Sequence, residues 1–183
     1  YSFVSDKLLE SVNQSNDQAY QLGNALSPEL QYYRLTLTPS LLSKVYQNIR
    51  AGHDQFALFE IGKTHSKLQG VTDEGVPVES DMLGLVWAMN DKRAQTGQGA
   101  AYFQAKTYLD YLAASIGLTL DYAPIEKEPD FEIAKPFDWR RSALVTDRQT
   151  GNYVGVIGEY SPVARRKLKR PVNSAGLELM LTP

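Results

Sequence analysis

The order of apolar and polar residues along the chain predicts strands separated by helices. A period of two, or a short apolar run, indicates a strand, because successive side chains of a strand point to opposite faces of a sheet. The predicted strands are 31–37, 56–65, 82–89, 118–125 and 175–181, and 141–160 is predicted as two strands joined by the turn RQTGN. The segment 70–80 is predicted as a loop.

Helical periodicity is clearest over 38–52. Thr38 stands at the expected N-cap, Pro39 at the first helical position and Gly52 at the stop. A helix of this kind buries one apolar stripe and leaves the rest to solvent or to a partner. The stripe consists of Leu41, Leu42, Val45 and Ile49.

Three further helices are predicted. One begins at a Ser5 cap, one covers 102–117, and a short one begins at Ser161 and Pro162. Strands that return through hairpins, with helices between them, favour an α+β fold with a mainly antiparallel sheet flanked by helices. We find no internal repeat or linker, so a single domain over 1–183 is expected.

Composition removes several classes of function. The formal net charge of −2 provides no global attraction for nucleic acid, and the absence of cysteine excludes disulfides and thiolate metal sites. No apolar run approaches the roughly 20 residues of a membrane span, so no membrane partner is expected. The chain begins at Tyr1 and not at a methionine, and we expect it to be a fragment of a longer protein.

Glutamates recur in three of the predicted strands. Glu60 lies in LFEIG, Glu159 in VIGEY and Glu178 in GLELML. If neighbouring strands bring them onto one face of a sheet, they form a carboxylate cluster that could bind a metal or divide acid and base roles.

A structural alternative for the same glutamates is favoured. A carboxylate is almost never fully buried without a partner, and Arg34, Arg140 and Arg141 are available. On this alternative the glutamates pair with arginines, accept backbone N–H bonds or face water. The positions expected to have structural roles are Arg34, Glu60, Gly62, Gly158 and Glu159.

The remaining candidate residues and motifs give weaker indications of a functional site. His65 lies five positions after Glu60, so strand alternation places the two on opposite faces and argues against a catalytic pair. The run RRKLKR at Arg165–Arg170 is the dense basic cluster, and a solvated helix end is favoured over an RNA contact. No P-loop or complete dinucleotide-binding glycine pattern occurs.

Eight short segments form an ordered set along the chain. They are YSFVS at 1–5, NALSPE at 24–29, YRLTLTPSLL at 33–42, LFEIG at 58–62, AYFQAKT at 101–107, DWRRSA at 138–143, VGVIGEYSP at 154–162 and GLELML at 176–181. In this order the set resembles the catalytic-like domain of the bacterial phenylalanyl-tRNA synthetase beta subunit.

The resemblance implies a class II aminoacyl-tRNA synthetase-like sheet in a cytoplasmic protein. It also implies an alpha subunit as partner, in an alpha-beta heterotetramer that attaches phenylalanine to tRNA. In that family the alpha subunit carries the active site, which uses ATP and magnesium, and the beta domain has lost the signature residues. GKTHSK at 62–67 lacks the phosphate-binding arginine of the second class II motif, and AGLELML at 175–181 ends without that of the third.

The expected function is therefore a non-catalytic scaffold and subunit interface, without catalytic, cofactor-binding or metal residues of its own. The helix over 38–52 occupies the place of the class II interface helix, which makes the stripe of Leu41, Leu42, Val45 and Ile49 the interface candidates. The alternative is a stand-alone α+β domain with a carboxylate metal or ligand site formed by the three glutamates.

The chain also departs from the family pattern. Asp138, Trp139 and Arg140 stand where the family has His-Pro-Gly, and Ser161 replaces the histidine of G-E-L-H-P. These departures leave open which contacts those four positions make.

Overall fold

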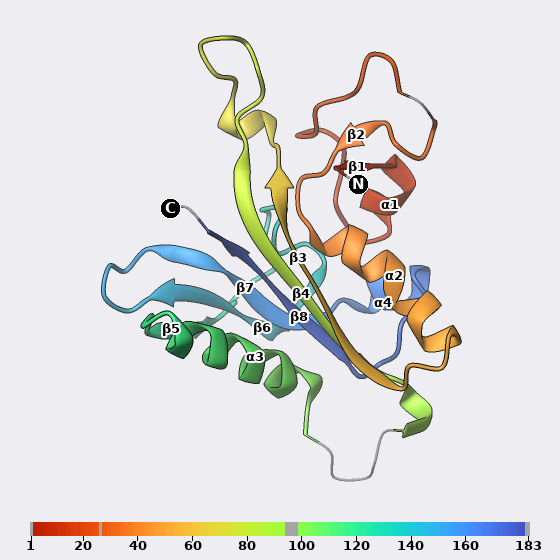
Figure 1. Ribbon diagram of the computed structural model, residues 1–183, viewed down its shortest axis with the longest axis vertical. Helices are drawn as coiled ribbons and strands as arrows, with labels where there is room; N and C mark the ends of the chain where they lie inside the picture. Colours follow the sequence, from red (N-terminus) through yellow and green to blue (C-terminus); the bar gives the residue numbers. More distant parts are fainter. Residues whose placement is uncertain (1, 26, 94–98, 182–183) are drawn as a thin grey trace.

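Six strands form one antiparallel sheet in the computed structural model, which describes residues 2–25, 27–93 and 99–181 (Figure 1). Their order is β3-β4-β8-β7-β6-β5, and every neighbouring pair is antiparallel. The bounds are β3 (Gln55–Thr64), β4 (Ser80–Met89), β5 (Leu120–Pro124), β6 (Phe137–Asp147), β7 (Tyr153–Tyr160) and β8 (Ser174–Met180). The predicted α+β class with a mainly antiparallel sheet is confirmed.

Within the described part of the chain, four α-helices and a small two-stranded sheet surround these strands. The helices are α1 (Asp6–Glu10), α2 (Thr38–Arg50), α3 (Ala101–Ser115) and α4 (Pro162–Lys167), and the small sheet pairs β1 (Phe3–Val4) with β2 (Tyr32–Tyr33). The hydroxyls of Ser5 and Ser161 cap α1 and α4, as their positions in the sequence predict. No helix among the described residues has the length and apolar character needed to cross a membrane.

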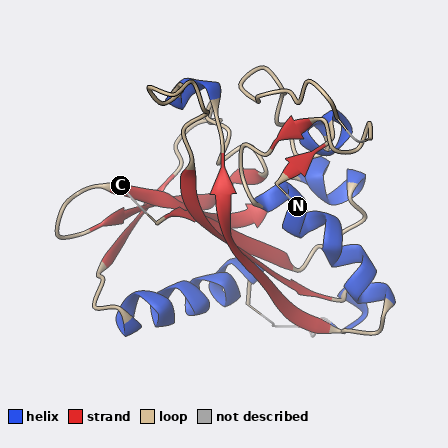
Figure 2. Cartoon of the chain, turned by 45° about the horizontal axis from the view of Figure 1, so that its top comes forward, coloured by secondary structure: helices blue, strands red, loops and turns tan. Residues whose placement is uncertain are grey.

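The two faces of the sheet are covered by different helices: α2 packs on one face and α3 on the other (Figure 2). Alternate residues of β4 show the division, because Met82 and Val86 join the core under α2, whereas Leu83 and Trp87 join the core under α3. The face on which a strand residue lies therefore decides which helix it meets.

The last strand, β8, lies in the middle of the sheet between β4 and β7. Its residues from Ser174 to Leu179 are buried. A strand with neighbours on both edges and a helix over each face has no solvent side, which explains an apolar run without alternation. Glu178 is the charged exception.

The predicted strand 31–37 is wrong after Tyr33. Only Tyr32–Tyr33 is β-structure, and the alternation fails because Arg34 and Thr36 are as deeply buried as Leu35 and Leu37. The hydroxyl of Thr36 accepts a hydrogen bond from Gln14, and Arg34 reaches across to β3. Long-range polar contacts, which a local pattern does not record, hold this segment in place.

Candidate functional site

Glu60 is held by Arg34, which comes from the segment before α2. Arg34 Nη1 lies 2.7 Å from Glu60 Oε1, and Arg34 Nε donates to the carbonyl oxygen of Lys63 at 2.9 Å. Arg34 is only 3% exposed, and a buried charge requires such partners. Gly62 leaves the space that the guanidinium fills, because a Cβ at that position would collide with Arg34 Nη2. Glu60 therefore fixes the segment before α2 against β3.

Glu178 caps the first turn of α2 from the middle of the sheet. Its Oε1 accepts the N–H of Leu37 at 2.6 Å, and its Oε2 accepts the N–H of Thr38 at 2.9 Å as well as the Thr38 hydroxyl. The N-cap residue of α2 is Leu37, which offers no capping side chain, so the expectation that Thr38 is the N-cap is wrong. Complete burial raises the pKa of Glu178 to about 7, and its three hydrogen bonds oppose that rise.

Glu159 pairs with Arg141 on the other face of the sheet. The Nη1 of Arg141 lies 2.5 Å from Glu159 Oε2, and this hydrogen bond raises the pKa of Arg141 above its usual value. Glu159 lies opposite Ala175, a residue of the core under α3. Glu178 and Glu60, in contrast, both lie opposite Gly84, whose neighbours are Leu37 and Leu41 on the α2 side.

The three glutamates therefore do not form one cluster. Two lie on the α2 face and are bound to a guanidinium or a helix end, and the third lies on the α3 face. Among the described residues there is no group of three or more histidine, cysteine, aspartate or glutamate side chains that could hold a metal ion. The hypothesis of a carboxylate site formed by Glu60, Glu159 and Glu178 is wrong.

The segment after Glu60 is also occupied by structural contacts. Lys63 Nζ lies 2.8 Å from Glu79 and 3.3 Å from Asp81, and the hydrogen bond to Glu79 raises the pKa of Lys63. His65 is buried, with its Nε2 3.4 Å from Glu79 and its ring 4.5 Å from that of Tyr33. The cation that follows Glu60 is thus neutralised by neighbouring acids, which does not favour phosphate binding.

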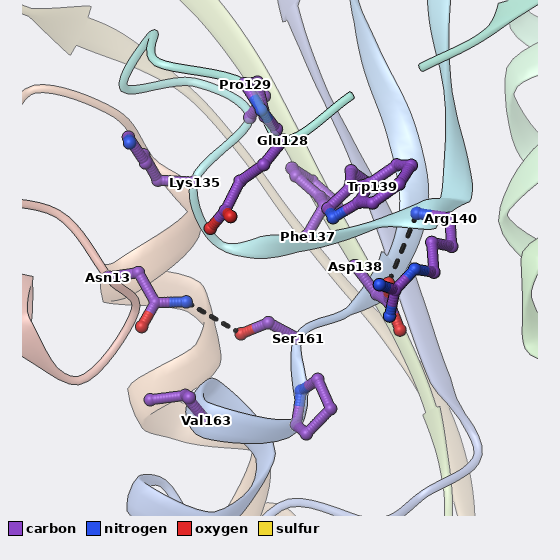
Figure 3. Close-up of a pocket in the computed structure, with 12 residues that line it drawn as sticks. Asn13, Glu128, Pro129, Lys135, Phe137, Asp138, Trp139, Arg140, Ser161 and Val163 are labelled. Atoms are coloured by element: carbon purple, nitrogen blue, oxygen red, sulfur yellow. Dashed lines mark hydrogen bonds between the residues drawn. The ribbon is translucent and has the colours of Figure 1, made fainter. Parts of the chain in front are cut away.

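The divergent positions come together at one cavity. Asp138, Trp139, Arg140 and Ser161 all line a cavity of about 430 Å³ (Figure 3). Asn13 Nδ2 donates to Ser161 Oγ at 3.3 Å, and the N–H of Arg140 donates to Asp138 Oδ1 at 3.2 Å. The Arg140 guanidinium lies over the Trp139 ring, 4.7 Å from its centroid. These four departures from the family pattern therefore lie on a single local surface.

Glu128 and Lys135 complete the charged lining of this cavity, and Figure 3 shows the Glu128 side chain extending into it. Asn13 follows α1, whereas Glu128 and Lys135 lie in the connection between β5 and β6, so no spacing in the sequence joins them to Ser161. The Ser161 hydroxyl accepts the N–H of Ala164 and thereby caps α4, so this hydroxyl has a structural role.

The interface candidates lie on the wrong side of their helix. Leu41, Leu42 and Val45 are buried in the core between α2 and the sheet, and Ile49 packs against the same core. An apolar stripe on a helix beside a sheet is consumed by folding, so it cannot also serve a partner. The solvent side of α2 instead carries Lys44, Tyr46, Gln47 and Arg50.

Exposed apolar side chains do gather on the face of the sheet that α3 covers. We name this area the β3–α3 surface, and it consists of Phe59, Ile61, Tyr108, Tyr111 and Leu112. Phe59 is 70% and Ile61 is 65% exposed. Helix α3 packs mainly over β4, β7 and β8, so the outer strand β3 is left without a helix over this face. These side chains line a cavity of about 300 Å³ that is almost entirely apolar.

Comparison with known proteins agrees with the ordered motifs. Phenylalanine–tRNA ligase beta subunits are 30% identical in Xanthomonas euvesicatoria pv. vesicatoria and 29% identical in Bacillus cereus, over 100% and 92% of this chain. The alignments cover 22% and 20% of those proteins, so this chain spans about a fifth of the length of the curated relatives it matches.

A solved structure shares the fold. The pyrrolysyl tRNA synthetase PylSc of Desulfitobacterium hafniense aligns with a TM-score of 0.67 and 14% identity, over 99% of this chain and 58% of that one. This likeness shows a class II tRNA synthetase-like fold and, at that identity, the fold alone. The family model described as the phenylalanyl tRNA synthetase beta chain CLM domain matches residues 1–181. The chain therefore belongs to the family of the phenylalanyl tRNA synthetase beta chain CLM domain.

Proposed function

We propose that this chain is a non-catalytic scaffold and subunit-interface domain of a phenylalanyl-tRNA synthetase beta subunit in the cytoplasm. Its role is to support an assembly with the alpha subunit, in which the alpha subunit carries the ATP- and magnesium-dependent attachment of phenylalanine to tRNA. The single observation that carries the proposal is the use of Glu60, Glu159 and Glu178 in contacts that hold the fold.

The scaffold part is tested with the intact protein assembled with its alpha subunit. Glu159→Gln removes the charge that pairs with Arg141. For a scaffold residue we expect a lower unfolding midpoint and an unchanged kcat for phenylalanine-dependent exchange of pyrophosphate into ATP. A catalytic carboxylate would instead show a large fall in kcat, about 100-fold or more, without loss of stability. The matched control is Asp121→Asn, which breaks a surface pair with Arg148.

We assign the β3–α3 surface to contact with the alpha subunit. The support is the uncovered apolar side chains of β3, since exposed apolar patches of this kind usually contact another polypeptide. Burying a side chain as large as Phe59 or Ile61 contributes about 1.5 to 3 kcal/mol, and two such residues are exposed side by side. The solvent side of α2 stays a second predicted contact, through residues other than the buried stripe.

The interface part is tested by co-purification with a tagged alpha subunit. The double change Phe59→Ser and Ile61→Ser should weaken association by roughly 100-fold or more, if each residue contributes about 1.5 kcal/mol. Val71→Ser is the control, because Val71 is also an exposed apolar residue (54%) and lies in the loop before β4. Unchanged association of a folded double variant would remove the β3–α3 surface from the alpha-subunit interface.

A further inference from the structure

A second cavity on the molecule is lined by positive charge. We name it the basic pocket: a cavity of about 360 Å³ lined by Arg165, Arg166, Lys169 and Arg170, with Pro162 and Val172. Its lining comes from α4 and the residues after it, and Lys169 lies near Tyr46 of α2. Figure 1 shows α4 beside α2. None of the four cations forms an ion pair with any residue in the described ranges 2–25, 27–93 and 99–181. A solvated helix end explains exposed cations, but it does not explain a buried one.

Arg170 is the buried cation of this pocket. It is only 6% exposed, and its guanidinium lies 4.5 Å from the centroid of the Tyr160 ring. Its Nη1 reaches Ser174 Oγ at a long 3.5 Å, whereas Nε and Nη2 have no hydrogen-bond partner among the described residues. A buried guanidinium with one long hydrogen bond is costly, since burial penalises the charge and the N–H groups of Nε and Nη2 find no acceptor among the described residues. An oxyanion in the pocket would offset this buried positive charge, which no ion pair among the described residues compensates.

The neighbouring cations add to the positive potential of the basic pocket. Burial and the charge of Arg165 lower the pKa of Arg170 to about 10, which leaves it charged at neutral pH. Lys169 Nζ lies 5.7 Å from the ring centroid of Tyr46, and Arg50 lies over the same ring at 5.9 Å, so the positive surface continues onto α2. The acid near the pocket rim, Asp91, accepts the N–H groups of the chain at 172 and 173 and is held there.

The backbone of Lys169 has an unusual conformation. Lys169 has a φ of 50°, in the left-handed region, immediately after the C-cap of α4. Glycine is the usual residue at this position, and another residue there costs about 1 kcal/mol or more. The chain therefore carries a positive charge at a place where glycine would be more stable.

We propose that the basic pocket binds a phosphate group. A phosphate fits this pocket, because the guanidinium of Arg170 and the flexible cations around it match a multivalent oxyanion. The group can belong to a small molecule, such as a pyrophosphate, or to the backbone of an RNA strand. The chemistry of recognition is the same in both cases.

The experiment measures binding of two probes to the intact protein at low salt: sodium pyrophosphate by calorimetry, and a labelled single-stranded RNA 12-mer by fluorescence anisotropy. Both should bind saturably, and the double change Arg165→Gln and Arg166→Gln should weaken binding of each at least tenfold. Lys127→Gln is the control, since Lys127 is exposed on a distant loop and carries the same charge. Stronger RNA binding, with a salt dependence that falls by about 0.7 in slope per cation removed, identifies a strand as the source. Stronger pyrophosphate binding identifies a small phosphate compound.

Lys169→Gly separates binding from folding. The change relieves the left-handed backbone and should raise the unfolding midpoint, yet it should weaken phosphate binding severalfold. Absence of saturable binding of both probes would overturn the proposal. Binding that the arginine double variant leaves unchanged would overturn it as well.

Discussion

Replacing Glu178 by glutamine tests the cap on α2 most sharply, because the two side chains have the same shape and only the carboxyl titrates. The carboxyl oxygens accept the N–H groups of Leu37 and Thr38. Glutamine keeps one acceptor oxygen and places an NH₂ group against the second N–H. An unsatisfied buried donor costs about 1 to 3 kcal/mol, so we expect Glu178→Gln to lower the free energy of unfolding by about 2 kcal/mol at pH 5.

The difference should depend on pH. Burial raises the pKa of Glu178 from 4.5 to about 7, so the folded protein holds this proton more tightly than the unfolded chain. The resulting stabilisation is complete below pH 4.5 and is lost as the pH rises through 7. At about 1.36 kcal/mol per pKa unit, the loss between pH 5 and pH 8 is about 2.5 kcal/mol. Glutamine does not titrate, so the gap between wild type and variant should close over this range.

The assay is urea-induced unfolding of both proteins at pH 5, 6, 7 and 8, followed by tryptophan fluorescence. Taking the difference at each pH cancels the titration of all other groups. A gap that widens with pH would refute the reasoning, because it would mean that the hydrogen bonds outweigh burial and hold the folded pKa of Glu178 below 4.5. Asp121→Asn, at a surface pair, is the control and should change stability by less than about 1 kcal/mol.

Two further changes test the contacts around α2 by the same urea assay. Gly62→Ala should destabilise the fold by about 1 to 3 kcal/mol, because the new methyl group displaces the Arg34 guanidinium. The control Gly23→Ala has open space around the new methyl group and should be nearly neutral. Equal losses of stability in the two variants would contradict the close contact between Gly62 and Arg34. Leu42→Ala should lower the free energy of unfolding by about 2 to 5 kcal/mol, because Leu42 is a core residue. Lys44→Ala, on the exposed side of α2, should change it by no more than about 0.5 kcal/mol. A Leu42→Ala protein as stable as the wild type would contradict the burial of the stripe.

Local signals in the sequence were sufficient for most of the helices and strands. Ser5 and Ser161 each precede a helix and cap it, and Gly117, with a φ of 71°, follows α3. These features act within one turn of the chain, so the residues themselves carry the information. The hairpin of β6 and β7 is local in the same sense, because its turn lies between its two strands.

The candidate site was only partly predictable. The need of each glutamate for a partner follows from the cost of burying charge, and Arg34 and Arg141 are among the arginines that the sequence offers as partners. Glu159 meets Arg141 across the hairpin of β6 and β7. The partner of Glu178 depends on strand order, and no local pattern shows that β8 inserts between β4 and β7. Glu178 thereby meets the start of α2, a contact across 140 residues of sequence.

The sequence by itself determined most of the elements, their antiparallel arrangement and the family, because periodicity, caps and ordered motifs are properties of neighbouring residues. Only the tertiary structure decided what the polar and apolar side chains do. It buried the stripe of α2 against the sheet, left Phe59 and Ile61 exposed on β3, and separated Glu159 from the other two glutamates. It also enclosed Arg170, whose Nε and Nη2 have no partner among the described residues. The physical reason is that burial and pairing depend on which distant segments meet, and those contacts exist only once the sheet is assembled.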